Sequence, residues 1–156
     1  MLVLSTWLAL VQLRQAGALE LLAILAMIWL ADVAAYFSGR AFGKHKLAPS
    51  ISPGKTWEGA IGGGAAVLVF GLLLIPLLPA FFPERSAAHY AALAPALIIL
   101  TAISIIGDLF ESLLKRQAGL KDSSNVLPGH GGVLDRIDSQ LSTLPLVALF
   151  WLSSLH

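Results

Sequence analysis

Long apolar runs constrain this chain more than any other feature of its sequence. Residues 19–37, 59–82, 95–116 and 138–156 each approach the roughly 20 residues that a helix needs to cross a hydrocarbon core. Charged residues make up only 12% of the chain, too few to give a soluble globule of this length a polar surface. We therefore expect an all-α fold, a polytopic transmembrane helix bundle with about four spans.

The first thirteen residues are also apolar, but this segment is short. It lacks a basic start and a small-residue cleavage site, so we interpret it as a short membrane segment rather than a signal peptide. We find no repeat, low-complexity tract or soluble domain, and expect one membrane-embedded domain over residues 1–156. The absence of cysteine excludes disulfides, thiolate metal sites and a cysteine nucleophile. Gly59 and Gly63 have a spacing that predicts close helix packing.

The charged residues are concentrated between the apolar runs. Six lie within residues 32–58 and nine within residues 108–138. Four consecutive spans would place loops 38–58 and 115–138 on one side of the membrane and loop 83–94 on the other. The first two loops contain most of the lysines and arginines, so the positive-inside rule places them in the cytoplasm.

Two predicted helices carry an acidic residue at a matching depth. Asp32 and Asp108 each lie about 20 Å along the axis from the outer end of their helix. An ionised side chain at the membrane centre costs ~2.5–3.5 kcal/mol, so such residues usually face a polar cavity or a partner. Glu111, Ser112 and Lys115 continue the helix face of Asp108. The alternative for this face is an interfacial helix end with a Glu111–Lys115 ion pair.

Asp135 and Asp138 lie three residues apart at the start of the last predicted helix, a spacing that directs both carboxylates toward one point. Mg²⁺ characteristically binds one or two carboxylates together with substrate phosphates. Asp108 or Glu111 could complete such a coordination shell. For Asp135 alone, a helix N-cap is the simpler interpretation.

The segment SISPGKTWEGAIGGG, residues 50–64, invites comparison with a phosphate-binding P-loop. It is not one, because Pro49 stands where the motif needs glycine, and we expect no strand before it. Lys55 and Thr56 nevertheless come just before a predicted helix N-terminus, where phosphate binds well. The alternative is an ordinary polar loop.

The segment PGHGG, residues 128–132, has three glycines whose backbone N–H groups can closely approach a ligand. His130 could contact phosphate, act as an acid or base, or brace the loop. Cationic groups, carboxylates and a membrane setting together predict phosphoryl or nucleotidyl transfer to a lipid. That chemistry needs positioning and charge neutralisation rather than a protein nucleophile.

Residues 112–138 follow the pattern S-x-x-K-R-x₄-K-D-x₅-P-x-H-G-G-x-x-D-R-x-D. This pattern resembles the signature of the phosphatidate cytidylyltransferases, also called CDP-diacylglycerol synthases. Residues 29–59 and 106–116 are also similar to that family, and the resemblance covers roughly residues 29–150. It implies transfer of CMP from CTP to phosphatidic acid, giving CDP-diacylglycerol and pyrophosphate in phospholipid biosynthesis.

The resemblance also implies roles for individual residues. Asp108, Asp135 and Asp138 would bind Mg²⁺, with K⁺ as a candidate second cation, and Lys121 would act with them in catalysis. Asp32, Glu111 and Asp122 would help to position these side chains. The phosphates of CTP or lipid would be bound by Ser52, Lys55, Thr56, Lys115, Arg116, His130 and Arg136.

The implied setting is a homodimer in the bacterial cytoplasmic membrane, with the active site facing the cytoplasm and no nucleic-acid partner. Members of this family are usually much longer, with further helices before residues 19–37, so we expect a shortened version, a truncated gene product or an isolated half. Two rival functions are a non-catalytic membrane protein that binds nucleotide and an ion transporter, because intramembrane acids also mark ion paths. A transporter would not need Lys55, Lys121 and the glycine-rich loop.

Overall fold

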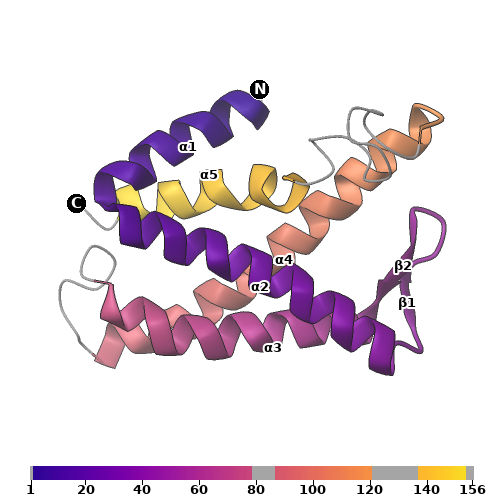
Figure 1. Cartoon of the computed structure of the whole chain (residues 1–156), viewed down its shortest axis with the longest axis horizontal. Helices are drawn as coiled ribbons and strands as arrows, with labels where there is room; N and C mark the ends of the chain where they lie inside the picture. Colours follow the sequence, from indigo (N-terminus) through magenta and orange to yellow (C-terminus); the bar gives the residue numbers. More distant parts are fainter. Residues whose placement is uncertain (1, 79–86, 121–136, 154–156) are drawn as a thin grey trace.

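The computed structural model describes residues 2–78, 87–120 and 137–153, which form helices and one small sheet (Figure 1). The all-α membrane class expected from the apolar runs is confirmed. The elements in chain order are α1 (Leu2–Ala16), α2 (Ala18–Phe42), β1 (Lys46–Ala48), β2 (Ser52–Thr56), α3 (Trp57–Leu74), the short 3₁₀ helix η1 (Ile75–Leu77), α4 (Ala87–Gln117) and α5 (Asp138–Ser153).

Three segments of the described chain, rather than the expected four, are long and apolar enough to cross a membrane. They are Ala18–Phe42, Trp57–Leu77 and Tyr90–Gln117. Helix α5 has only 16 described residues. At 1.5 Å per residue it reaches about 24 Å, less than the roughly 30 Å of a hydrocarbon core. The short apolar N-terminal segment is the 15-residue helix α1.

Three helix boundaries differ from those expected. Helix α3 ends at Leu74, where η1 begins, although one helix was expected over residues 59–82. Helix α2 continues to Phe42, so Arg40 is helical rather than part of a loop. Helix α4 begins at Ala87, and Pro95 lies inside it instead of in its first turn. An apolar environment favours continuation of a helix through proline, because no water is available to satisfy backbone groups that the helix releases.

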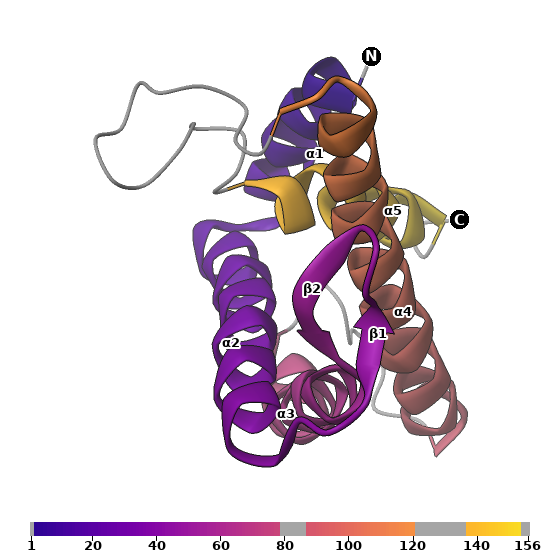
Figure 2. The ribbon, with the colours of Figure 1, turned by 90° about the vertical axis from the view of Figure 1, so that its right-hand side faces the viewer.

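A β-hairpin joins α2 to α3 and stands in front of the helices, between α2 and α4 in Figure 2. The strands are antiparallel, with Lys46 opposite Thr56 and Ala48 opposite Ser52. The expectation that no strand precedes Lys55 is therefore wrong. The segment is still no P-loop, because Pro49 replaces the required glycine.

Helices α2 and α3 pack backbone against backbone. A Cβ atom at Gly59 would lie 2.8 Å from the carbonyl oxygen of Ala35, and one at Gly63 would lie 3.0 Å from that of Ala31. Glycine is required at this distance because any side chain would collide with the neighbouring main chain. The close packing predicted from the spacing of these two glycines is confirmed.

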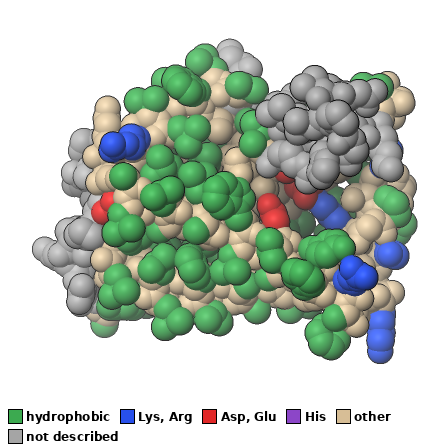
Figure 3. Space-filling model, viewed as in Figure 1, with side chains coloured by type: hydrophobic (Ala, Val, Ile, Leu, Met, Phe, Trp, Pro, Cys, Tyr) green, Lys and Arg blue, Asp and Glu red, His purple; other side chains and the backbone are tan. Residues whose placement is uncertain are grey.

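Two apolar clusters hold the bundle together. One joins α1, α2 and α5 around Leu13, Ile28 and Leu144. The other joins α2, α3 and α4 through Met27, Val67, Leu93 and Leu97. Apolar side chains also cover much of the outer surface (Figure 3), as expected for helices that face lipid.

Candidate functional site

A pocket of about 640 Å³ lies where α2, the hairpin, α3, α4 and the first residue of α5 meet. Figure 3 shows acidic and basic side chains in a hollow, with hydrophobic side chains beside and below it. The residues that could bind a polar ligand there include Asp32, Tyr36, Arg40, Lys46, Ser52, Lys55, Thr56, Thr101, Ser104, Asp108 and Asp138.

Three carboxylates from three helices line this pocket. Asp32 belongs to α2, Asp108 to α4 and Asp138 to the first turn of α5, which is not one of the three spans. Burial, and after it the neighbouring Asp108 carboxylate, raises the pKa of Asp138 to about 6. Residues far apart in the sequence therefore create a region that favours a bound positive charge.

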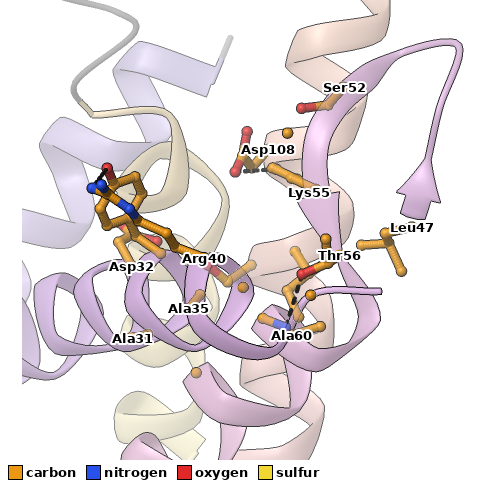
Figure 4. A pocket seen from close by; sticks show the side chains of 18 of the residues that line it. Ala31, Asp32, Ala35, Arg40, Leu47, Ser52, Lys55, Thr56, Ala60 and Asp108 are labelled. Atoms are coloured by element: carbon orange, nitrogen blue, oxygen red, sulfur yellow. Dashed lines mark hydrogen bonds and ion pairs between the residues drawn. The ribbon is translucent and has the colours of Figure 1, made fainter. Parts of the chain in front are cut away.

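Lys55 is positioned by strand β2 and points across the pocket toward α4 (Figure 4). Its ammonium group forms an ion pair with the Asp108 carboxylate, and each side chain retains 26% of its exposure. The hairpin is thereby attached to the helix that carries the acid. A ligand phosphate could replace Asp108 as the partner of Lys55, and a cation could replace Lys55 as the partner of Asp108.

Thr56 ends β2 and caps helix α3. Its side-chain oxygen accepts a hydrogen bond of 3.1 Å from the Gly59 N–H, and the residue is buried. The Thr56 hydroxyl, which accepts this hydrogen bond, can still donate its own proton to a ligand. A phosphate contact by Thr56 therefore stays a prediction, and the structure adds a capping role for this residue.

Ser139 fixes the start of α5 against α2. It is buried, and its hydroxyl donates a 2.9 Å hydrogen bond to Oδ2 of Asp32. Its backbone N–H donates to Oδ1 of Asp138 at 2.8 Å. On the other side, a side chain at Gly107 would overlap Ser142, so α4 and α5 are in close contact beside Asp108. These contacts place Asp138 and Asp108 in one pocket, and no sequence motif pointed to Ser139.

We expect the Ser139→Ala substitution to destabilise the fold by about 1–2 kcal/mol, because the Asp32 carboxylate loses a hydrogen-bond donor. The measurement is the thermal unfolding midpoint of the purified chain in detergent. Ser142→Ala is the matched control, since the Ser142 hydroxyl only donates to the Ser139 carbonyl within the same helix. Equal midpoints for the two variants would show that the contact between α2 and α5 contributes nothing.

Other predicted site residues lie away from the pocket lining. Lys115 pairs with Glu111 at 3.3 Å, which is the helix-surface arrangement considered as the alternative. Nε of Arg116 donates to the Ile51 carbonyl at 3.3 Å and so links α4 to the hairpin turn. The substrate-binding roles of Lys115 and Arg116 and the supporting role of Glu111 stay predictions.

Five predicted residues lie outside the part of the chain that the structure describes. Their proposed roles, including that of the third metal ligand, are therefore untested by the geometry. They are Lys121, Asp122, His130, Asp135 and Arg136.

Comparison with known proteins assigns this arrangement to a family. The model of the cytidylyltransferase family matches residues 1–154. The chain belongs to the cytidylyltransferase family.

Curated relatives in this family are similar along most of the chain. The phosphatidate cytidylyltransferase of Pseudomonas aeruginosa is 50% identical over 155 residues, which are 97% of this chain and 55% of the relative. That of Haemophilus influenzae is 48% identical over 86% of this chain and 46% of the relative. That of Staphylococcus aureus is 43% identical over 90% of this chain and 52% of the relative. The chain spans about half the length of the curated relatives it matches.

Proposed function

We propose that this chain carries the catalytic site for transfer of CMP from CTP to phosphatidic acid, giving CDP-diacylglycerol and pyrophosphate. The observation that carries the proposal is that Asp108 and Asp138, from separate helices, line the same pocket as Lys55, which is paired with Asp108. Relatives named phosphatidate cytidylyltransferase support the assignment of the reaction.

In this reaction an oxygen of the lipid phosphate attacks the α-phosphorus of CTP. A new P–O bond forms, the bond from the α-phosphorus to the bridging oxygen breaks, and pyrophosphate leaves. The attacking phosphate is already anionic, so no protein base is required. The protein must instead bring two anions together and neutralise their charge, which is the main requirement of phosphoryl-transfer chemistry.

The oxygen donors in the pocket fit a hard divalent cation such as Mg²⁺. Asp108 and Asp138 would hold it, and Mg²⁺ commonly completes its shell with substrate phosphates and water. Within the described residues, no group of three or more His, Asp or Glu side chains could hold a metal ion, and Asp135 lies outside them. Bound Mg²⁺ would neutralise and polarise the reacting phosphates. K⁺ as a second cation stays a prediction.

Lys55 would bind a phosphate of CTP after exchanging its ion pair with Asp108. We expect Lys55→Ala to raise the KM for CTP by about tenfold or more, because one charge-assisted contact is lost. Initial rates over a range of CTP concentrations measure this effect. Lys44→Ala is the control, since Lys44 is exposed and lies outside the pocket lining. An unchanged CTP dependence would assign the hairpin a purely structural role.

The membrane setting fits the lipid substrate. Three apolar helices make the chain a membrane protein, and the relatives named above are bacterial. The concentration of basic residues near the hairpin supports a site on the cytoplasmic face of the inner membrane. A homodimer stays part of the proposal, and cross-linking in native membranes would test it.

The direct experiment uses the purified chain in liposomes with radiolabelled CTP, phosphatidic acid and Mg²⁺. We expect a labelled, lipid-extractable product that is absent when EDTA is added. A folded chain that binds CTP without forming this product would instead favour the binding-only function. Labelled product would also argue against an ion transporter as the primary function.

A further inference from the structure

The pocket contains two cations, Arg40 and Lys46, to which the sequence analysis assigned no role. Arg40 lies two residues before the end of α2, and Lys46 begins β1. Both line the same pocket as Lys55. The proposed reaction needs two phosphate-bearing ligands in one pocket, and Lys55 beside Asp108 accounts for only one of them.

We propose that Arg40, oriented by Tyr36 and assisted by Lys46, binds the phosphate monoester of the lipid substrate. This inference rests on the proposed function and adds a second phosphate subsite to it. The occupant is defined by its chemistry, a phosphate monoester attached to a diacylated glycerol. The other phosphate-bearing ligand, CTP, is assigned to the subsite at Lys55.

Tyr36 orients the Arg40 guanidinium along the wall of the pocket. The Tyr36 hydroxyl accepts a hydrogen bond from Arg40 at 3.3 Å, and the two residues are one helical turn apart. The Tyr36 ring packs edge-on against Phe37, with 5.4 Å between the ring centroids. A guanidinium has five N–H donors in a fixed plane that matches the oxygens of a phosphate. Most of these donors remain available after the bond to Tyr36.

Arg40 and Lys46 keep their charge available for a ligand. Within residues 2–78, 87–120 and 137–153, the ion pairs are Lys55–Asp108, Lys115–Glu111 and His45–Glu58. None of them involves Arg40 or Lys46. An anion that enters the pocket therefore meets two cations that no described carboxylate neutralises.

The position of Arg40 favours the lipid rather than the nucleotide. The outer face of α2 that leads to Arg40 is apolar and exposed, with Trp29, Val33 and Phe37 each more than half exposed. Arg40 lies near the end of this span, where arginine side chains typically reach the level of the lipid phosphates. A lipid lying along α2 would thus present its phosphate to Arg40 while its chains stay in contact with the apolar face.

The test measures binding without catalysis. Dioctanoyl phosphatidate and dioctanoyl phosphatidylcholine are titrated separately into the purified full chain in detergent by calorimetry, and CTP is titrated in a third series. We expect the wild-type chain to bind the phosphatidate and not the phosphatidylcholine. Arg40→Ala should weaken phosphatidate binding by about tenfold or more and leave CTP binding unchanged.

Two further variants separate orientation from charge, and a third is the control. Arg40→Lys keeps the charge but not the planar guanidinium, and it should weaken phosphatidate binding by about threefold or more. Tyr36→Phe removes the hydrogen bond that orients the guanidinium, and it should weaken phosphatidate binding less than Arg40→Ala does. Arg14→Ala is the control, because Arg14 is exposed on α1 outside the pocket lining. Circular dichroism checks that each variant has the wild-type helix content.

The outcomes distinguish this subsite from the proposed reaction. Unchanged phosphatidate binding in Arg40→Ala overturns the subsite, whether or not the chain is active. Weakened CTP binding with unchanged phosphatidate binding, or equal losses of both, also overturns it. A wild-type chain that needs Arg40 to bind phosphatidate but forms no product would instead support the subsite and contradict the proposed reaction.

Discussion

Asp138→Asn should lower the rate of CDP-diacylglycerol formation by at least about 100-fold while the chain still folds and inserts into membranes. Asparagine keeps the size of the side chain and one oxygen but removes the negative charge that would hold a divalent cation. Folding should not suffer, because the neutral amide relieves repulsion between position 138 and Asp108. Initial rates over a range of Mg²⁺ concentrations measure the loss, and Mn²⁺ binding followed by electron paramagnetic resonance gives a readout independent of turnover.

Asp32→Asn is the matched control for this prediction. It makes the same chemical change in the same pocket, but an asparagine oxygen can still accept the hydrogen bond from Ser139. We expect a smaller loss of rate, about tenfold, because Asp32 supports the first turn of α5 rather than the cation itself. A near-normal rate for Asp138→Asn, or equal losses in both variants, would contradict the assignment of Asp138 as a metal ligand.

Gly59→Ala should lower the stability of the fold, because the added methyl group would collide with the main chain of α2. The new Cβ would lie 2.8 Å from the backbone oxygen of Ala35, 3.1 Å from Oγ1 of Thr56 and 3.4 Å from Cα of Gly39. Because two of these neighbours are main chain, α2 and α3 would have to separate. We expect a net loss of about 1–3 kcal/mol, even though alanine has the higher helix propensity.

The control for Gly59→Ala is the same substitution five positions further along the helix. A Cβ at Gly64 would meet only Cγ2 of Thr101, at the ordinary contact distance of 3.7 Å. Gly64→Ala should therefore be neutral or raise stability by up to about 1 kcal/mol through helix propensity. The thermal unfolding midpoints of both variants in detergent provide the comparison. A Gly59→Ala midpoint as high as that of Gly64→Ala would show that the close contact between α2 and α3 does not require glycine at position 59.

The helices could be predicted from sequence because lipid imposes a simple requirement on them. A chain in a hydrocarbon core must satisfy its backbone hydrogen bonds internally, so a long apolar run has little choice but to form a helix. The limits of that reasoning appear at the helix ends. Helix α2 continues through Arg40 to Phe42, and α4 begins at Ala87, eight residues before Pro95. Hydropathy marks the segment inside the membrane and not the last hydrogen-bonded turn.

The hairpin could not be predicted because its sequence carries little strand signal. Ser52–Thr56 reads SPGKT, with proline and glycine in place of alternating apolar residues. Contacts with residues further along the chain hold it instead. The Trp57 N–H donates to the His45 carbonyl at 3.0 Å, and the His45 ring lies 2.7 Å from Oε1 of Glu58. These contacts direct Lys55 into the pocket.

By itself the sequence determined that this chain forms membrane helices, and it singled out Asp32, Asp108, Asp138 and Lys55, because charged groups are costly beside apolar segments unless a site uses them. Only the tertiary structure decided that these groups share one pocket. It also revealed the bond from Ser139 to Asp32 and the orientation of Arg40 by Tyr36. The physical reason is that hydropathy depends on each residue alone, whereas the distance between two side chains depends on how every helix between them packs.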